Sequence, residues 1–427
     1  MERLIFHIDV NSAYLSWEAA YRIHHLGGTM DLRNIPSAIG GDVSMRHGII
    51  LAKSIPAKPY GIQTGMTIME AKLKCPDLYL APPNYSLYQR CSKAFFNILQ
   101  EYTHEVEVYS IDEAFLDMTS TIHLFGEPVQ VANQIKDRIK EELGFTVNVG
   151  ISSNKLLAKM AGELKKPDLV HTLFPSEIKR KMWILPVSEL FFCGRATTRK
   201  LLNIGINTIG DLAHTDVDLL RNHLKKQGEV MWAFANGLDF SVVLAESPVQ
   251  KGYGNSTTTP FDVSDAETAH KVLLALCETV ASRLRKDNFQ AQVISVGIKS
   301  FDLRYASHQM HLKNPTNITA ELYHYACRLF EDSWDKHTPI RHLGVHTSVL
   351  SSGKSPRQMD LFDTTDYVKL ETLDRTIDTI RTRYGNDAAK RAIFVQTSDS
   401  KQRFIDHMEG GVSREKRTVD YSKITVA

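Results

Sequence analysis

The sequence predicts an α+β protein with several domains. The chain has 427 residues, and a single hydrophobic core usually stops growing near ~250–300 residues. It is 43% hydrophobic and 23% charged, which is typical of globular domains and excludes fibrous or largely disordered classes. Apolar residues recur with helical spacing in some segments and alternate as in strands in others, so both kinds of element are expected.

The N-terminal third predicts a small antiparallel sheet over two helices. An apolar run over 4–8 indicates a strand, and Asn11-Ser12 precede a predicted helix. Farther along we expect helices at 85–103 and 127–143 and strands at 106–111, 114–118 and 145–151. This is the order of a split βαβ unit, in which the first strand lies beside the hairpin. Asp9 and the pair Asp112-Glu113 should therefore meet at one edge of the sheet.

The remaining segments predict smaller units and a second α+β domain. Residues 31–66 are rich in Gly and Pro with broken strand patterns, and 186–213 hold two short helices with glycine turns. A polar stretch at 245–260 indicates a linker. We then expect helices at 264–287 and 316–333, strands at 290–301, 307–313 and 340–350, a loop at 351–356, a helix at 366–384 closed by Gly385, and a disordered tail after 398.

Several classes of protein are excluded by what the sequence lacks. It has no run of about 18 apolar residues, so we expect no transmembrane helix. A carboxylate at Asp9 comes too early for a signal peptide, which favours the cytoplasm. The five cysteines form no CxxC pair, which argues against structural zinc or a disulfide framework. A net charge of +2 neither requires nor excludes a nucleic-acid partner.

Three carboxylates carry the strongest chemical signal. Asp9 follows one predicted strand, and Asp112 and Glu113 precede another. Neighbouring carboxylates repel each other unless positive charge lies between them. Two Mg²⁺ ions supply such charge and can clamp both oxygens of a phosphoryl displacement. The alternative is that Asp9 caps a helix while Asp112 and Glu113 form a plain hairpin turn.

Several ordered motifs surround these carboxylates. They are His7-Ile8-Asp9-Val10-Asn11-Ser12-Ala13-Tyr14, Ser110-Ile111-Asp112-Glu113-Ala114-Phe115-Leu116-Asp117, Val149-Gly150-Ile151-Ser152-Ser153-Asn154-Lys155 with Ala158-Lys159 and Lys165-Lys166-Pro167, and Gly194 with Gly205-Ile206-Asn207-Thr208-Ile209-Gly210-Asp211-Leu212. Together they resemble the motifs of the Y-family (translesion) DNA polymerases of the DinB and UmuC type. The resemblance runs from residue 3 to about 362.

The resemblance implies a right-hand polymerase. Its parts are a ferredoxin-like palm (1–30 and 79–165), small fingers (31–78), a helical thumb (166–244, with a helix-hairpin-helix around 190–212) and an α+β little finger (245–350). Residues 351–427 then hold a clamp-binding loop, a helix and a C-terminal tail.

The implied activity is template-directed, low-fidelity DNA synthesis across lesions, in which the primer 3′ oxygen attacks the α-phosphate of a dNTP. Asp9, Asp112 and Glu113 would be catalytic and would hold two Mg²⁺ ions, for which Mn²⁺ can substitute, with the Val10 carbonyl as a further ligand.

The nucleotide contacts implied by the resemblance are Ala13, Tyr14, Ser54, Lys58 and Lys166. Tyr14 stands where the family has its steric gate, a ring that clashes with a ribose 2′ oxygen; alone, it reads as a core aromatic of a helix. The sequence departs from the family at Ile55 and Lys58, where Tyr and Arg are usual. Lys58 offers point charge but no bidentate fork, so triphosphate binding should depend more on Lys166.

The implied DNA contacts lie in the hairpin region, at Gly194, Arg195, Arg199, Lys200 and Gly205. Backbone amides at glycine turns can approach phosphates closely without reading bases. The alternative for this region is a simple packing element of two helices.

A clamp-docking peptide is implied at Gln358-Met359-Asp360-Leu361-Phe362. Gln358 would form hydrogen bonds, while Leu361 and Phe362 would fill an apolar pocket of a bacterial sliding clamp. The alternative is that Leu361 and Phe362 staple the following helix. The expected partners are thus primer-template DNA, a dNTP and the clamp, with no membrane and a monomeric chain.

Two other functions remain open at this point. A nucleotidyl cyclase could use the same metal site, but it would need neither 190–212 nor the clamp peptide. A non-catalytic or partner-dependent accessory protein of the family, acting as a scaffold through DNA and clamp binding, should have lost one of the three carboxylates, and all three are present.

Overall fold

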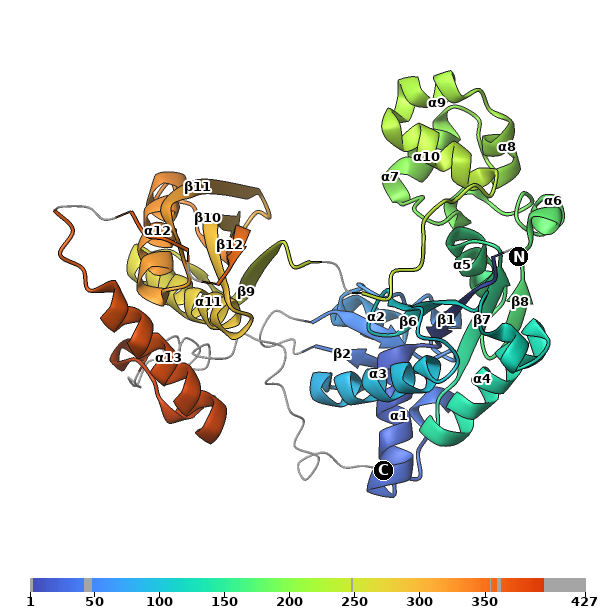
Figure 1. Cartoon of the computed structure of the whole chain (residues 1–427), viewed down its shortest axis with the longest axis horizontal. Helices are drawn as coiled ribbons and strands as arrows, with labels where there is room; N and C mark the ends of the chain where they lie inside the picture. Colours follow the sequence, from blue (N-terminus) through green and yellow to red (C-terminus); the bar gives the residue numbers. More distant parts are fainter. Residues whose placement is uncertain (1–2, 42–47, 247–248, 354, 359–361, 395–427) are drawn as a thin grey trace.

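The computed structural model describes residues 3–41, 48–246, 249–353, 355–358 and 362–394. These residues form a five-stranded N-terminal sheet, a small three-stranded sheet, a helical unit and a four-stranded C-terminal sheet (Figure 1). The expected α+β multidomain class is confirmed. No helix in the described ranges combines the length and apolar character needed to cross a membrane. The tail predicted after residue 398 lies outside the described residues.

The N-terminal sheet has the strand order β5-β6-β1-β7-β8. Strand β1 lies in the middle and pairs antiparallel with both β6 and β7, while β8 joins β7 in parallel. The predicted position of the first strand beside the hairpin is therefore correct, and only β8 has no counterpart in the expected elements. The bounds are β1 Ile5–Val10, β5 Val106–Val108, β6 Glu113–Asp117, β7 Val147–Ser152 and β8 Val170–Thr172.

Alternation along β1 divides its side chains between two faces of the sheet. Phe6, Ile8 and Val10 enter a core shared with helices α1 (Ala13–Leu26), α3 (Tyr85–Gln100) and α4 (Pro128–Leu143). Ile5, His7 and Asp9 face the other side, where helix α5 (Lys155–Glu163) packs. Helices therefore cover strand β1 on both faces of the sheet.

Helix α5 packs against the sheet at an unusually short distance. A Cβ at Gly150 on β7 would lie 1.9 Å from the backbone oxygen of Ala158. Asn154 caps the helix by accepting a hydrogen bond from the Leu157 N–H at 2.8 Å. The absent side chain of Gly150 therefore allows α5 to carry its lysines over the end of β1 and β6.

A small sheet of order β3-β2-β4 packs beside α1 with its own apolar cluster. The bounds are β2 Ser37–Gly40, β3 Ile50–Lys53, β4 Tyr79–Ala81 and helix α2 Ile68–Lys74. The broken strand patterns expected over 31–66 correspond to β2 and β3.

The helical unit is larger than the two helices expected at 186–213. It contains α6 Ile178–Lys181, α7 Arg195–Asn203, α8 Ile209–His214, α9 Val217–Leu224 and α10 Lys226–Ala235. Thr208 and Asp211 cap α8 reciprocally, through hydrogen bonds to each other's backbone N–H groups. Apolar side chains from all these helices share one core with α5.

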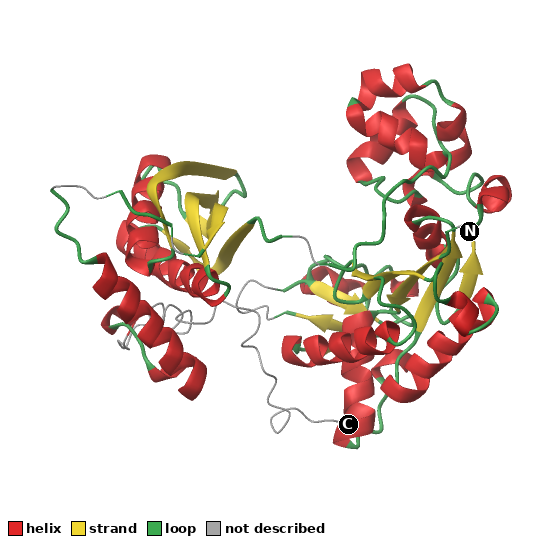
Figure 2. Cartoon of the chain, in the orientation of Figure 1, coloured by secondary structure: helices red, strands yellow, loops and turns green. Residues whose placement is uncertain are grey.

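The C-terminal sheet is antiparallel throughout, with order β11-β10-β12-β9, and its helices cover one face (Figure 2). The bounds are β9 Gly252–Val263, α11 Ala266–Lys286, β10 Phe289–Ser300, β11 Tyr305–Thr316, α12 Thr319–Ser333, β12 Ile340–Ser352 and α13 Tyr367–Tyr384.

The linker predicted at 245–260 is wrong for most of its length, because β9 begins at Gly252 and pairs with β12. Its glycines and hydroxyl residues resemble a linker in composition. The strand lies at the sheet edge, and Gly254 and Ser256 line the face that no helix covers, where polar side chains are tolerated.

Candidate active site

The strand register brings two of the three predicted carboxylates together. Asp9 and Glu113 are direct Cα partners on the antiparallel strands β1 and β6. Side chains at such positions share one face of the sheet. Asp112 precedes β6, and its carbonyl accepts a hydrogen bond from the Val10 N–H at 3.0 Å. Residues about a hundred positions apart therefore converge as the sequence predicts.

Each carboxylate is held by a different partner. Asp9 forms an ion pair with Lys166, which also contacts Glu163 at 2.8 Å. The Lys159 ammonium lies 2.7 Å from Glu113, and the His7 ring contacts the same carboxylate at 3.2 Å. Asp112 accepts a hydrogen bond from the Ser110 hydroxyl. These cations and hydrogen bonds offset the repulsion between the neighbouring carboxylates.

The environments of Asp9 and Glu113 move their pKa values in opposite directions. Burial raises the pKa of Asp9 to about 6, although the Lys166 charge opposes the rise. Burial also opposes ionisation of Glu113, but hydrogen bonds from His7 and Lys159 hold its pKa at about 2. Burial of Asp9 therefore leaves its charge only partly compensated, as suits a ligand for an added cation.

A cavity of about 430 Å³ opens at this edge between the N-terminal sheet and the small sheet. It gathers most of the residues that the sequence assigns to catalysis and nucleotide binding. Its lining is Asp9, Val10, Ser12, Ala13, Tyr14, Leu51, Ala52, Lys53, Lys58, Thr64, Ile111, Asp112 and Lys166. Glu113 and Ser54, both predicted site residues, do not line it.

Ser54 is buried in the turn that follows β3. Its hydroxyl donates to the Ile35 carbonyl at 2.7 Å and accepts from the Ser37 and Ala57 N–H groups. These bonds hold the turn after β3, so Ser54 shapes the segment that carries Lys53 and Lys58. Its neighbour Ile55, where the family usually has Tyr, is 47% exposed.

Tyr14 lies at the border of the cavity within an aromatic cluster. Its ring stacks on Tyr88 with centroids 4.4 Å apart and planes 6° from parallel, and the Tyr85 ring meets it edge-on at 6.3 Å. It is half-buried and lines the cavity. The ring therefore packs against the aromatic residues of α3 and also bounds the open space. Its role as a steric gate stays a prediction.

Sequence reasoning missed Lys53, Thr64 and the supporting role of Lys159. Burial and the nearby charge of Lys58 lower the pKa of Lys53. Lys155 and Lys159 lie four residues apart, so α5 places both over the sheet, where they meet Glu107 and Glu113. That spacing of lysines is the signal that could have identified Lys159.

Oxygen ligands for a divalent cation are present at the cavity. The carboxylates of Asp9 and Asp112 and the carbonyl of Val10 are the hard donors that Mg²⁺ prefers. Among the described residues, no three His, Cys, Asp or Glu are already gathered as metal ligands. In the structure, Lys166 pairs with Asp9 and Lys159 pairs with Glu113. The donor set fits the cation once Asp9 exchanges Lys166 for it.

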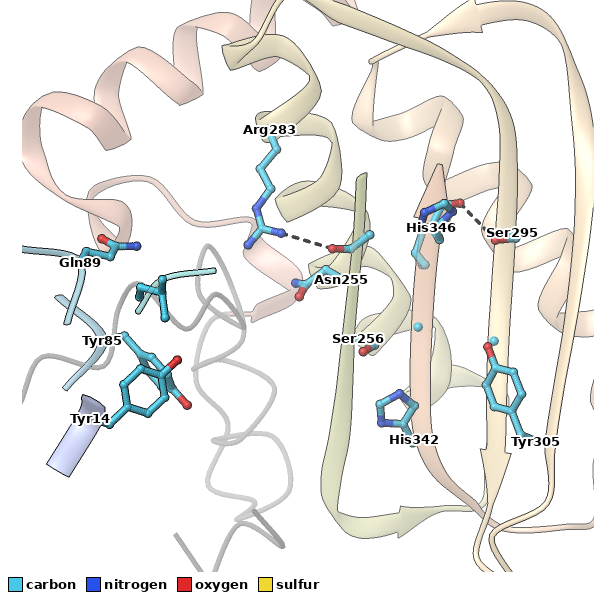
Figure 3. Close-up of a pocket in the computed structure, with 15 residues that line it drawn as sticks. Tyr14, Tyr85, Gln89, Asn255, Ser256, Arg283, Ser295, Tyr305, His342 and His346 are labelled. Atoms are coloured by element: carbon cyan, nitrogen blue, oxygen red, sulfur yellow. Dashed lines mark hydrogen bonds between the residues drawn. The ribbon is translucent and has the colours of Figure 1, made fainter. Parts of the chain in front are cut away.

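A larger cavity of about 620 Å³ lies between the N-terminal sheet unit and the C-terminal sheet. Figure 3 shows Tyr14, Tyr85 and Gln89 on one side and the open face of β9, β10 and β12 on the other. The Arg283 side chain extends from α11 toward β9 and donates to the Gly254 carbonyl at 3.3 Å. His342, His346 and small residues such as Gly297 and Gly344 line the sheet side. Tyr14 borders both cavities.

The predicted hairpin residues lie along α7 and in the turn after it, and all of them are exposed. Gly194 is the N-terminal cap of that helix, and Arg195, Arg199 and Lys200 project from it into solvent. Gly205, in the turn after α7, has a φ of 82°, which glycine adopts without strain.

The clamp peptide lies between β12 and α13. Gln358 is bonded through its backbone to Asn314, and Phe362 is 94% exposed. That exposure does not fit a hydrophobic staple on α13. Leu361, with Met359 and Asp360, lies outside the described residues.

Comparison with known proteins places this arrangement among DNA polymerases. The impB/mucB/samB family matches residues 8–163, and its C-terminal domain matches residues 250–361. DNA polymerase IV of Clostridium acetobutylicum is 45% identical, over 93% of this chain and all of its own. Proteins of the same name from Acetivibrio thermocellus and Bacillus subtilis (DNA polymerase IV 2) are 39% and 38% identical, covering 93% and 92% of this chain and 98% and 94% of their own.

A solved structure supports the fold independently. A Y-family DNA polymerase chimera superposes with a TM-score of 0.71 at 22% identity, over 82% of this chain and all of the chimera.

Proposed function

Because this chain belongs to the impB/mucB/samB family of Y-family DNA polymerases, we propose that Asp9, Asp112 and Glu113 form its catalytic centre. The protein is a DNA-directed DNA polymerase, and its activity is translesion synthesis on a primed template. The observation that supports the site is the register of β1 and β6, which sets Asp9 opposite Glu113 and Asp112 beside a lysine-lined cavity.

We assign the nucleotide to that cavity. Lys53, Lys58 and Lys166 bring three ammonium groups to one space of about 430 Å³, which suits the charge of a triphosphate. Lys166 already neutralises Asp9, so it can turn to a phosphate when a cation takes the carboxylate. Ala13 and Tyr14 bound the sugar side, where the Tyr14 ring would exclude a 2′ hydroxyl.

Members of this family depend on divalent metal ions, and we propose two Mg²⁺ ions held by Asp9, Asp112, Glu113 and the Val10 carbonyl. When bound, such ions stabilise the negative charge that develops on the phosphoryl oxygens, and Mn²⁺ can replace them. In the reaction the primer 3′ oxygen bonds to the α-phosphorus and the α–β bond breaks. Pyrophosphate leaves, and the hydroxyl proton passes to water.

The polymerase fold suggests the roles of the other units. We assign the palm to 1–30 and 79–165, the fingers to 31–78, the thumb to 166–244 and the little finger to 245–350. The larger cavity, bordered by Tyr14 and the open face of the C-terminal sheet, would hold the template beside the nucleotide. Gly194, Arg195, Arg199, Lys200 and Gly205 would contact DNA phosphates.

The remaining partners are also proposals. Gln358, Leu361 and Phe362 would dock on a bacterial sliding clamp, for which the 94% exposure of Phe362 leaves the ring accessible. The chain would act as a monomer on DNA in the cytoplasm.

Extension of a labelled primer tests the proposal. With Mg²⁺ and each dNTP offered singly, the protein should add the templated nucleotide and also misincorporate often, because small fingers provide little induced-fit checking. Short products are expected. A protein that binds the primer-template but adds nothing, in Mg²⁺ or Mn²⁺, would contradict the proposal and favour a scaffold role.

A further inference from the structure

An aromatic ledge lies beside Glu113, at the junction between the N-terminal sheet and the helical unit. We propose that this ledge, formed by Tyr109, Phe191 and Phe192, packs against the primer strand just behind its 3′ end. The inference rests on the proposed function, since it takes a DNA primer as the substrate. It assigns a role to three side chains that the catalytic centre does not use.

The ledge is continuous although its residues come from two units. The Tyr109 ring, just after β5, lies 6.3 Å from Phe191, and Phe191 meets Phe192 at 4.4 Å with their planes 66° apart. Tyr109 is 42% exposed and Phe192 is 59% exposed. The outer surface of the ledge therefore faces solvent, while Phe191 ties it to the core of the helical unit.

Phe192 is held in an unfavourable way on two counts. Its φ of 68° lies in the left-handed region, which a bulky residue rarely adopts because its Cβ crowds the backbone. Its large apolar ring also stays mostly in water. A glycine at this position would remove both penalties. Strain of this kind is found preferentially where a side chain must be presented to a ligand.

Lys159 connects the ledge to the catalytic centre. Its ammonium lies 5.6 Å from the Tyr109 ring centroid and 5.2 Å from that of Phe191, and it also forms the ion pair with Glu113. The ledge therefore starts beside Glu113, because Lys159 contacts both. A primer whose 3′ hydroxyl lies near Glu113 has the ledge directly alongside its last nucleotides.

The chemistry of the surroundings favours a nucleic-acid strand as the occupant. Apolar rings can pack against the deoxyribose sugars of a paired strand, a contact that does not depend on the base sequence. Gly194 and Arg195 follow the ledge within three residues, and Arg195, Arg199 and Lys200 are exposed. None of these three cations forms an ion pair with a described residue in the structure. They can therefore attract the phosphates of the same strand.

The test is Phe192→Gly in the full-length chain. Glycine fits the left-handed backbone, so the melting temperature should stay the same or rise. The dissociation constant for a recessed primer-template should rise about tenfold, which is a common scale for the loss of a packed aromatic ring at an interface. The constant for the single-stranded template alone should not change. Tyr109→Ala should shift primer-template binding in the same direction.

A matched control separates the effect of relieving backbone strain from the effect of losing the aromatic ring. Lys336 is exposed, has a φ of 65° and lies in the turn before β12, far along the chain from the ledge. Lys336→Gly should relieve the same kind of strain and leave both dissociation constants unchanged.

Two outcomes would overturn the inference. One is unchanged primer-template affinity in folded Phe192→Gly; the other is an equal loss for primer-template and single strand, which would mean that the ring does not contact the primer. Extension by the unmodified protein decides the proposed function separately. If that protein extends primers while Phe192→Gly binds them normally, only the ledge is wrong.

Discussion

At the scale of single residues, Tyr14 combines packing with its proposed role in nucleotide selection. The ring stacks on Tyr88 and also bounds the proposed nucleotide cavity. A rigid ring excludes an extra oxygen better than a mobile one, because moving it would break the stack. The aromatic cluster of α1 and α3 is therefore part of the proposed discrimination against ribonucleotides.

Tyr14→Ala should raise the use of ribonucleotides. Removing the ring opens room for a 2′ hydroxyl, so the ratio of rNTP to dNTP incorporation efficiency should increase at least about tenfold. Steady-state incorporation of a matched rNTP and dNTP measures the ratio. Tyr14→Phe keeps the ring and should keep the discrimination. An unchanged ratio in Tyr14→Ala would remove the gate assignment.

The sequence allowed the carboxylates to be predicted better than their partners. Asp9, Asp112 and Glu113 stand at strand ends, where alternation and strand order suffice to bring them together. The pairing of Asp9 with Lys166 and of Glu113 with Lys159 depends on how α5 and the turn after it pack, which one sequence does not specify. Phe192 was missed because nothing in its neighbours predicts a positive φ.

At the scale of elements, α5 depends on a close approach to the sheet. A Cβ on Gly150 would meet the Ala158 oxygen at 1.9 Å and the Gly162 nitrogen at 2.4 Å, and both are backbone atoms that cannot turn away. The position of α5 sets Lys155 and Lys159 over Glu107 and Glu113. The packing of this helix therefore determines which cations lie beside the proposed catalytic carboxylate Glu113.

Gly150→Ala should destabilise the protein strongly. The helix must move off the sheet, so we expect a loss of about 3 kcal/mol in the free energy of unfolding, at the high end for overpacked positions. Chemical denaturation measures it. Gly162→Ala is the comparison, since its Cβ would lie 3.2 Å from the His7 ring, and its effect should be much smaller. Equal, small effects would contradict the packing argument.

Helix α13 is attached to the C-terminal domain by a buried ion cluster. The Arg285 guanidinium on α11 pairs with Asp378 at 2.6 Å and with Asp374 at 3.1 Å, and it also donates to the Asn317 carbonyl at 2.7 Å. Asp374 accepts a further bond from the Thr319 N–H at 2.8 Å. The helix predicted from its apolar spacing is thus held largely by charges.

Arg285→Ala should release α13. It removes the close ion pairs of Asp378 and Asp374 and leaves the buried Asp374 carboxylate with Arg391, at 3.8 Å, as its remaining cation. Breaking a buried ion pair typically costs about 3–5 kcal/mol, so the helix should leave its site. Limited proteolysis within 367–384 should become faster. Arg375→Ala removes an exposed pair with Glu371 and should have little effect. Equal protection of α13 in both variants would show that other contacts hold it.

The boundary elements show why prediction failed where it did. Strand β9 was read as a linker because its open face carries Gly254 and Ser256, and a polar face toward a cavity resembles a loop in composition. The helices α9 and α10 were missed because they complete a core that they share with the neighbouring α8 and with α5, which lies far earlier in the chain. Both depend on tertiary contacts that local pattern does not report.

At the scale of the whole molecule, the structural units surround two neighbouring cavities. The nucleotide cavity and the larger cavity share Tyr14 and Ile111, and the C-terminal sheet closes the larger one from the far side. The proposed clamp peptide follows β12 on that same domain. Catalysis and template binding are thus proposed in neighbouring cavities, and clamp docking on a separate segment.

Replacing Leu361 and Phe362 by Ala should reduce stimulation by a bacterial sliding clamp. The pair supplies the apolar anchors, and loss of such anchors commonly abolishes docking of a short peptide. The ratio of clamp-assisted to unassisted primer extension should fall close to one. Tyr384→Ala, an exposed ring at the end of α13, is the control. Stimulation that survives in the double variant would place the docking peptide elsewhere.

The most direct test of the central claim is Asp112→Asn, assayed for DNA binding and for primer extension in parallel. The rate of primer extension should fall by at least about a thousandfold, because the amide cannot supply the charge that catalysis requires. Primer-template affinity should stay close to that of the unmodified protein. Asp117→Asn, on the same strand β6 but at its other end, should retain extension. Full extension by Asp112→Asn, or an equal loss of binding and extension, would contradict the claim that this edge of the sheet is the catalytic centre.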